Sequence, residues 1–389
     1  MISRSRLVIT ISSLVIMATA VVSIVLFSRY TLPVMAEHNS ESHLTSATPS
    51  QGPSYHREAM FYQNLGDGLV ECNICFRNCV IPQGERGYCK NKENKGGTLY
   101  NIVHGRPSAV QIDPVEKEPM YHMMPGTQIL CIGTAGCNFS CNHCQNWHLS
   151  QRSIEDLNYY NLPPEAIVRF ALEQGIPTIS FTYNDPISVY EYVYDVAKLA
   201  KENGLKIIWH SNGAINPEPL RKLLQYTDAV TIDLKGFSQK AYDNANAELA
   251  PVLEALKIIH QAGVWVEIVN LVIPTVNDDI NEIREMCEWI KNNLGPYVPV
   301  HFSRFHPSYK MKHLPSTPIK TLEKAHSIAE EVGMHFITVG NVPGHSYNST
   351  YCPGCDEKII HRVHFSVLEN KIKEGKCGYC GYKIPGIWQ

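Results

Sequence analysis

The sequence predicts an α/β fold, in which a partial TIM-like (βα)6 barrel lies between two small cysteine modules and follows an N-terminal transmembrane helix. From residue 128 onward, short β-branched runs alternate with longer amphipathic runs, which is typical of repeated βα units. Four cysteines precede this region within residues 72–89, and four more follow it within residues 352–380. An apolar stretch over residues 7–27 is long enough to cross a membrane.

These patterns divide the chain into five segments. They are an anchor or signal segment over residues 1–30, a polar linker over 31–55, a cysteine module with its lead-in over 56–127, the barrel over 128–345, and a second cysteine module over 346–389. A chain of 389 residues is long enough for one large domain with such modules. The formal charge of -3, with basic residues scattered along the chain, disfavours a nucleic-acid-binding surface.

The apolar stretch at residues 7–27 is interrupted only by Thr and Ser, as expected for a membrane anchor or a long signal segment. Arg4 and Arg6 precede it, and only Arg29 follows it before a long stretch free of Lys and Arg. This charge bias by itself places the remainder of the chain outside the membrane. Small residues at positions 34 and 36 also fit a cleavage site.

The first cysteine module consists of Cys72, Cys75, Cys79 and Cys89, with Pro and Gly interleaved among them. Four thiolates suit one tetrahedral metal ion, and zinc is favoured over a second iron–sulfur cluster. Two disulfides are the alternative, which a reducing compartment disfavours.

The most informative motif is the C-x3-C-x2-C run of Cys137, Cys141 and Cys144, just after the predicted strand at 128–133. Three thiolates on one loop can hold three irons of a four-iron, four-sulfur (4Fe-4S) cluster, whose corners ordinarily take four cysteines. One iron is then open to a chelating ligand. A structural zinc site needs a fourth ligand, and His143 lies too close to its neighbours to be a comfortable one. The loop therefore predicts a 4Fe-4S cluster.

The predicted barrel alternates short strands with longer helices. The strands are expected at residues 128–133, 178–182, 206–210, 229–233, 265–272 and 298–303, with a further strand at 336–340. The helices are expected at residues 163–174, 189–203, 217–224, 249–262, 278–293 and 321–332. Because such barrels carry their active sites at the carboxyl ends of the strands, functional residues are expected just after each strand.

Polar residues follow the second and third predicted strands. Asn184 and Asp185 can supply acceptor oxygens to a bound amine, and the sequence leaves open which of them does so. A plain turn before Pro186 explains these residues equally well. Ser211 and Asn212, ahead of a permissive glycine, suit a ribose or a carboxylate, although Ser-Asn-Gly is also a common turn.

Asp233 and Lys235 come at the end of the fourth predicted strand, at alternate positions that lie on the same side of an extended chain. An anion and a cation side by side can bind the amine and the carboxylate of an amino acid. A simple ion pair at the strand end explains their spacing equally well.

The second cysteine module pairs Cys352 and Cys355 with Cys377 and Cys380 across a 21-residue spacer. Paired C-x2-C motifs with glycine turns are typical of a zinc ribbon, in which the metal is structural. Because the module is too small for an apolar core, zinc would supply most of its folding free energy. A redox dithiol is the alternative for one C-x2-C alone, and the matching second pair argues against it.

Taken together, residues 70–389 resemble the radical S-adenosylmethionine (SAM) enzyme of the AmmeMemoRadiSam system, a relative of pyruvate formate-lyase activating enzymes. The resemblance lies in the cluster loop with the ring of His143 before its third cysteine, in Asp233-Leu234-Lys235, and in short motifs at 113–122, 306–311, 339–344 and 384–388. It implies SAM contacts from His143, Asn184, Asp185, Ser211, Asn212, Asp233 and Lys235. The chain departs from the family in its predicted anchor and in lacking a Gly-Gly-Glu type segment after the second strand.

The resemblance implies an enzyme that reductively cleaves SAM at the 4Fe-4S cluster, giving a 5'-deoxyadenosyl radical that abstracts hydrogen from a protein residue or a small metabolite. It implies a flavodoxin- or ferredoxin-type electron donor, with Memo-type and AMMECR-type proteins as system partners. Because the cluster needs reducing conditions and SAM is cytosolic, we expect a membrane protein with its catalytic body on the cytoplasmic side. The alternative from another class is a membrane-tethered iron–sulfur electron-transfer protein, which would leave SAM intact.

Overall fold

The computed structural model describes residues 56–389. The predicted anchor at 7–27 and the predicted linker at 31–55 lie outside the described residues, so both stay predictions. From residue 56 to the carboxyl terminus, none of the helices combines the length and the apolar character that crossing a membrane requires.

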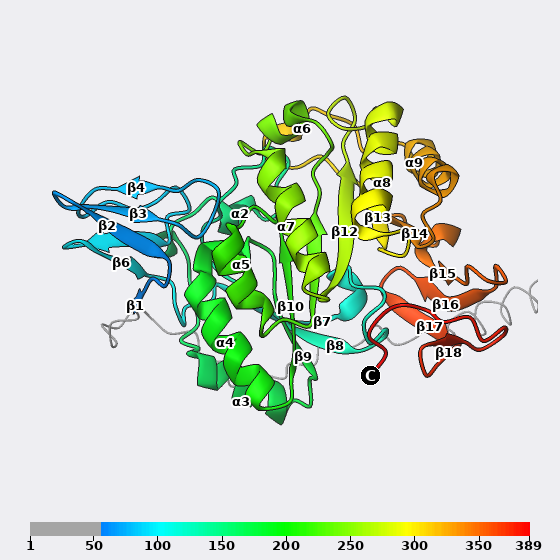
Figure 1. Ribbon diagram of the computed structural model, residues 1–389, viewed down its shortest axis with the longest axis horizontal. Helices are drawn as coiled ribbons and strands as arrows, with labels where there is room; N and C mark the ends of the chain where they lie inside the picture. The colour runs from blue at the N-terminus through cyan, green and yellow to red at the C-terminus, as the bar shows by residue number, and fades with distance from the viewer. Residues whose placement is uncertain (1–55) are drawn as a thin grey trace, which may run out of the picture. The chain divides into compact units, whose positions relative to one another are not determined.

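The centre of the described region is an eight-stranded sheet in the order β14-β13-β12-β11-β10-β9-β8-β7 (Figure 1). Seven of the strands are parallel and follow the order of the chain: β8 (Gln128–Gly133), β9 (Thr178–Phe181), β10 (Lys206–Ser211), β11 (Ala229–Asp233), β12 (Trp265–Val272), β13 (Val300–Arg304) and β14 (Ile337–Gly340). Their bounds agree with the predicted strands to within two residues. The prediction of an α/β fold built of βα units is therefore confirmed.

The eighth strand, β7 (Ala109–Pro114), runs antiparallel to β8 and lies where the sequence analysis predicts no strand. It pairs along its whole length, from Ala109 opposite Gly133 to Pro114 opposite Gln128. β7 and β14 are the two edges of the sheet and are not hydrogen-bonded to each other. The described sheet is thus open, and the predicted closure toward a TIM-like barrel stays a prediction.

Six longer helices connect the parallel strands: α3 (Pro164–Glu173), α4 (Tyr190–Glu202), α5 (Pro217–Leu224), α7 (Leu249–Gln261), α8 (Ile280–Leu294) and α9 (Ile319–Val332). Because the strands follow chain order, right-handed crossovers place all of these helices on the same face of the sheet. Local signals fix their ends. The Asp279 side chain accepts hydrogen bonds from the backbone N–H groups of Asn281 and Glu282 at the start of α8. Gly333, with a left-handed φ of 93°, ends α9.

The first cysteine module contains two three-stranded sheets. One is made of β1 (Arg57–Glu58), β6 (Thr98–Asn101) and β5 (Lys92–Lys95), and the other of β2 (Tyr62–Gly66), β3 (Leu69–Cys72) and β4 (Val80–Ile81). A fully buried ion pair between Lys92 and Glu191 joins the module to α4. Asn101 Nδ2 donates a second hydrogen bond to the Glu191 carboxylate at 3.0 Å. The module is therefore fastened to the central sheet by paired buried charges.

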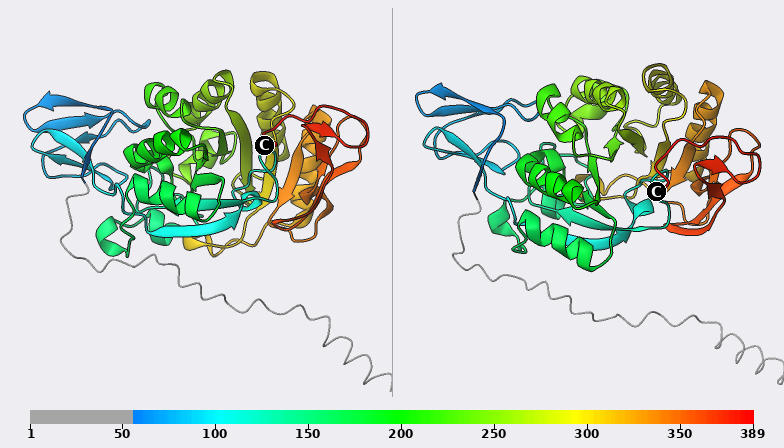
Figure 2. Two further views of the ribbon diagram at one scale, coloured as in Figure 1. Left: turned by 90° about the horizontal axis from the view of Figure 1, so that it is seen from below. Right: turned by 60° about the horizontal axis from the view of Figure 1, so that its bottom comes forward.

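The second cysteine module lies at the opposite end of the sheet from the first (Figure 2). Its strands are β15 (Thr350–Tyr351), β16 (Lys358–Val363), β17 (Ser366–Asn370), β18 (Ile372–Lys373) and β19 (Lys376–Cys377). Arg362 on β16 is fully buried and donates to the Tyr121 carbonyl at 2.8 Å and to Thr350 Oγ1 at 2.7 Å. Its Nε also lies 3.4 Å from the buried Glu116 carboxylate. These contacts fasten the second module to the segment that precedes β8.

Candidate active site

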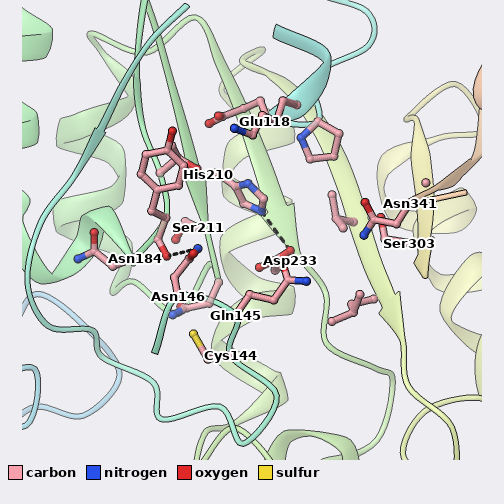
Figure 3. A pocket seen from close by; sticks show the side chains of 18 of the residues that line it. Glu118, Cys144, Gln145, Asn146, Asn184, His210, Ser211, Asp233, Ser303 and Asn341 are labelled. Carbon is pink, nitrogen blue, oxygen red and sulfur yellow. Dashed lines mark hydrogen bonds and ion pairs between the residues drawn. The ribbon is translucent and has the colours of Figure 1, made fainter. Parts of the chain in front are cut away.

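A cavity of about 500 Å³ lies at the carboxyl ends of the parallel strands. Side chains from β10, β11 and β13 line it, together with residues of the loops that follow β8, β9 and β14. Figure 3 shows several of them, with His210 and Asp233 directed toward each other from neighbouring strands. Parallel α/β folds bind their ligands at this edge of the sheet. The expectation that functional residues follow the strands therefore leads to this cavity.

The three cysteines of the cluster loop all line the cavity. Cys137, Cys141 and Cys144 lie on the segment between β8 and the short helix α2 (Trp147–Ser150). The backbone N–H of Phe139 donates to the sulfur of Cys137 at 3.4 Å, and the sulfur of Cys144 lies 3.3 Å from Ser150 Oγ. One wall of the cavity thus offers three half-buried sulfur ligands.

Burial keeps two of these thiols protonated. Burial raises the pKa of Cys137 well above its usual value and that of Cys141 to about 12, while the Lys235 ammonium opposes the rise at Cys141. Such thiols hold their protons at neutral pH unless a metal replaces them. Cys131 also lines the cavity, but it lies on β8, outside the cluster loop. The chemistry of the loop thus fits an iron–sulfur cluster held by three cysteines.

His143 lies on the same loop and is also buried at the cavity. Burial and, to a smaller extent, the nearby Lys235 lower its pKa to about 3, so the ring is neutral. Among the described residues, no hydrogen-bond partner reaches its buried Nδ1 atom. Because a buried ring nitrogen without a partner is costly, this atom is available to a ligand in the cavity.

Asn184 holds the cluster loop in place. Its Nδ2 donates to the Gly136 carbonyl at 2.7 Å and to Thr134 Oγ1 at 2.9 Å, and its Oδ1 accepts from the Thr134 N–H at 2.8 Å. Both ends of the amide are therefore engaged by the loop. The sequence analysis offers Asn184 and Asp185 as alternative acceptors for a bound amine, and these contacts favour Asp185 for that role.

Asp185, Ser211 and Asn212 form one hydrogen-bonded network beside the loop. The Asp185 carboxylate accepts from the backbone N–H of Asn212 at 2.7 Å, from the N–H of Ile187 at 2.9 Å, and from Ser211 Oγ at 3.1 Å. Burial raises the pKa of Asp185 to about 6, and these donors limit the rise. Asn212 Nδ2 also donates to Asn138 Oδ1 on the cluster loop at 2.7 Å. The three predicted residues are thus brought together, although they face one another as much as the cavity.

Asp233 and Lys235 form the ion pair that their spacing suggests, with Nζ 2.5 Å from Oδ2. His210, which the sequence analysis does not select, adds a third member, because its Nε2 lies 3.1 Å from Asp233 Oδ1. Burial opposes ionisation of all three groups. The charges of Lys235 and His210 nevertheless lower the pKa of Asp233, and the charge of Asp233 raises the pKa of each of them. Cys141 and Cys144 also raise the pKa of Lys235, so its ammonium lies near the sulfur wall.

Glu118 is a second cavity residue that the sequence analysis does not select. It is buried beside the hydroxyl of Ser180, which donates a hydrogen bond to it. Burial raises its pKa to about 7, and the charge of His210 opposes that rise. Its place in the motif at 113–122 was the available signal, but the sequence alone does not distinguish it from Glu116, which is buried against Arg362.

The second cysteine module has the arrangement of a single-metal site. The ligand atoms of Cys352, Cys355, Cys377 and Cys380 all lie within 4.8 Å of one another. Four sulfurs about 2.3 Å from one zinc ion would lie about 3.8 Å apart. The measured Cys352–Cys380 and Cys355–Cys377 sulfur distances of 3.6 and 3.8 Å match that value. The four residues can therefore hold one tetrahedral metal ion, as the paired C-x2-C motifs predict.

Comparison with known proteins links this site to a large family. A model of the Radical SAM superfamily matches residues 131–290. An uncharacterized protein of Methanocaldococcus jannaschii is 43% identical over 330 residues, which is 84% of this chain and 98% of that protein. The pyruvate formate-lyase-activating enzyme of Clostridium pasteurianum is 24% identical over 166 residues, or 40% of this chain and 67% of the enzyme. A solved domain of such an enzyme from Bacteroides vulgatus has a TM-score of 0.37 at 16% identity, covering 42% of this chain and 98% of that domain.

Proposed function

The chain belongs to the radical SAM superfamily, and on that premise we propose that it cleaves SAM reductively and uses the resulting radical to abstract hydrogen from a substrate. The observation that carries the proposal is the set of three thiols on one wall of a polar cavity, formed by Cys137, Cys141 and Cys144. These three cysteines would hold a 4Fe-4S cluster, which would supply the single electron that reductive cleavage of SAM to a 5'-deoxyadenosyl radical requires.

The protein's own part is to hold and orient SAM beside the sulfur wall. We assign the carboxylate of the methionine group to Lys235, whose ammonium lies near Cys141 and Cys144 and is kept charged by Asp233. We assign the amine to Asp185, whose buried carboxylate lines the same cavity. An ammonium brought to Asp185 would also favour the ionised form of this carboxyl, which burial disfavours.

The remaining polar residues position these two groups or meet the nucleoside. Ser211 and Asn212 fix the Asp185 carboxylate through their hydroxyl and N–H groups and are near enough to meet a ribose. The free Nδ1 of the neutral His143 ring suits a hydrogen bond from the adenine amino group. Nearly half of the residues that line the cavity are buried, which helps to exclude water from a reactive radical.

We further propose an activating-enzyme-like substrate, either a protein residue or a small metabolite, and membership of the AmmeMemoRadiSam system. The similarity to a pyruvate formate-lyase-activating enzyme supports the first point. Radical SAM enzymes generally take their electron from an external donor, and a reduced flavodoxin or ferredoxin is our candidate. Memo-type and AMMECR-type proteins are the candidate partners, and recovery of neither protein in affinity purifications from native cells would contradict this part of the proposal.

We also propose that the predicted anchor holds the body at the cytoplasmic side of a membrane. Both the need of the cluster for reducing conditions and the cytosolic origin of SAM support this side. A reporter that is active only outside the membrane, fused at the carboxyl terminus, is expected to be inactive. An active reporter would overturn the assignment.

The electron-transfer alternative accounts for less of the cavity. An electron carrier has no use for the partly buried charges of His210, Asp233 and Lys235 and the buried carboxyl of Glu118 around a space of about 500 Å³. Charged groups lose solvation when they are buried, and groups of this kind cluster at functional sites. We therefore favour the enzyme.

The test is the formation of 5'-deoxyadenosine. The full-length chain is purified in detergent without oxygen, reconstituted with iron and sulfide, and incubated with SAM and dithionite before chromatography. We expect 5'-deoxyadenosine from the wild type and from Cys287→Ala, which alters a buried thiol in α8, and none from Cys141→Ala. An intact cluster that leaves SAM uncleaved, or spectroscopy showing four protein ligands on it, would overturn the proposal.

A further inference from the structure

The four cysteines of the first module converge on one place. Cys72 ends β3, Cys75 and Cys79 lie in the turn between β3 and β4, and Cys89 lies in the loop before β5. All four are free thiols, and the backbone N–H of Cys72 donates to the Cys79 carbonyl at 2.9 Å. The segment that leads to Cys89 passes beside Cys79, because a Cβ atom added at Gly87 would stand 3.8 Å from the Cys79 sulfur.

Their spacing differs from that of the zinc-ribbon cysteines. Across residues 56–389, the four cysteines Cys352, Cys355, Cys377 and Cys380 are the only group of three or more possible metal ligands whose atoms all lie within 4.8 Å of one another. No three sulfurs of the first module are therefore that close. One zinc ion draws its sulfurs to about 3.8 Å from one another. The first module consequently lacks the compact tetrahedron that zinc requires.

The same wider spacing is found at the cluster loop. Cys137, Cys141 and Cys144 line one cavity, yet among the described residues they too do not form a group whose sulfurs all lie within 4.8 Å of one another. A four-iron cube explains this spacing, because each cysteine binds a different corner and not a common ion. The loop carries three such cysteines, whereas the first module carries four.

We propose that Cys72, Cys75, Cys79 and Cys89 hold a second 4Fe-4S cluster, one whose four irons are all bound by the protein. This replaces the expectation of zinc at this module.

The module packs directly against the cluster loop. The backbone of Gly136 lies so close to Cys89 that a Cβ atom on the glycine would stand 2.1 Å from the Cys89 carbonyl oxygen. Arg77 Nε donates to the Asn138 carbonyl at 2.6 Å, and the Phe76 and Phe139 rings meet edge to face at 5.8 Å. The two sets of cysteines are thus separated by a few directly packed residues.

This packing gives the second cluster a function, which rests on the proposed reaction. A reduced flavodoxin or ferredoxin would give one electron to the cluster of the first module. That cluster would return to its oxidised state by reducing the cluster at Cys137, Cys141 and Cys144. One electron enters and one leaves, and SAM is consumed only at the loop. The presence of the second cluster does not depend on this step.

Iron analysis of the full-length chain, reconstituted without oxygen, tests the site. We expect about eight irons and eight sulfides per wild-type chain, since each cube contributes four of each. The triple variant Cys137→Ala/Cys141→Ala/Cys144→Ala is expected to keep about half of this iron, with an electron paramagnetic resonance signal after dithionite that does not respond to SAM. The variant Cys75→Ala/Cys79→Ala is expected to keep the other half, with a signal that SAM alters.

Two matched variants serve as controls. Cys287→Ala should keep all the iron, and Cys355→Ala/Cys380→Ala should lose one zinc but no iron. A triple loop variant with zinc and no iron would overturn the inference. Should that variant fail to fold, Cys75→Ala/Cys79→Ala with the full wild-type iron would overturn it equally. A wild type with about four irons that still makes 5'-deoxyadenosine would contradict the second cluster and leave the proposed function intact.

The relay has its own readout. With a reduced ferredoxin as donor, Cys75→Ala/Cys79→Ala should make 5'-deoxyadenosine more than tenfold more slowly than the wild type. Dithionite is small enough to reduce the loop cluster directly, so with this donor the loss should be much smaller. An equal loss with both donors would show that the first module only supports the fold.

Discussion

A methyl group added at Gly136 should push the cluster loop and the first cysteine module apart. Gly136 has a left-handed φ of 73°, and a Cβ atom there would lie 2.1 Å from the Cys89 carbonyl oxygen and 2.8 Å from Asn91 Oδ1. The first neighbour is backbone and cannot rotate away. The Gly136→Ala variant must therefore move either the loop or the segment that carries Cys89.

The loss in the free energy of unfolding of Gly136→Ala has two parts, and a matched variant isolates one of them. Gly175 has a similar φ of 64° with no atom within 4 Å of an added Cβ, so Gly175→Ala carries only the left-handed cost of about 1–2 kcal/mol. Gly136→Ala adds the overlap with Cys89, which requires roughly 1 Å of backbone movement in a close-packed region and typically costs about 1–3 kcal/mol more. We expect the free energy of unfolding to differ between the two variants by that second amount.

Denaturant unfolding of the reconstituted protein without oxygen measures this difference. The same samples report iron content and 5'-deoxyadenosine formation, and we expect both to fall for Gly136→Ala while Gly175→Ala keeps wild-type values. Equal stabilities and equal iron contents for the two variants would refute the reasoning, because they would mean that the loop and the module do not touch as described.

Three further predictions concern buried charges. Lys235→Met leaves the Asp233 carboxylate without its closest cation and should lower the free energy of unfolding by about 3 kcal/mol, whereas Asp233→Asn/Lys235→Met should regain most of this without regaining 5'-deoxyadenosine formation. The pKa of Glu118 is raised by burial to about 7, so its contribution to stability is present at low pH and is lost as the pH rises from about 4.5 to 7. Over that range, the unfolding temperature of Glu118→Gln should therefore rise relative to that of the wild type. Parallel pH profiles of the two unfolding temperatures would contradict this. Arg362→Met leaves the buried Glu116 carboxylate without its cation and should lower the free energy of unfolding by about 3–5 kcal/mol. Zinc analysis should still find one ion per chain in this variant. Loss of that zinc would instead show that Arg362 supports the metal site.

The parallel sheet was predictable because each of its strands is a short apolar run between polar turns. β9, for example, is buried along its whole length, and three of its four residues are β-branched or aromatic. β7 gives no such signal, because Gln111 and Asp113 interrupt its apolar residues and it ends in Pro114. Its place beside β8 depends on tertiary pairing, which single-sequence patterns do not carry.

The residues of the candidate site also differ in how far the sequence predicts them. Spacing alone identifies Cys137, Cys141 and Cys144, because covalent geometry limits how far apart ligands on one loop can be. Spacing does not show which way a side chain points, and Asn184 illustrates this. Its type and position suit a ligand contact, yet its amide bonds to the cluster loop on both sides. His210 was missed for the opposite reason, since only the neighbouring strand brings Asp233 to it.

The charges around the cavity suit a ligand better than they suit the stability of the fold. A partly buried ion pair such as Lys235 with Asp233 stabilises a fold weakly, and apolar residues of similar size often do as well or better. Here His210 joins the pair, and Glu118 lies near it with a pKa raised by burial to about 7. Lys235 keeps a full charge next to the sulfur wall, whereas Glu118 is poised to gain or lose a proton near neutral pH. The cavity is therefore suited to binding a fixed anion at Lys235 and to exchanging a proton with a ligand at Glu118.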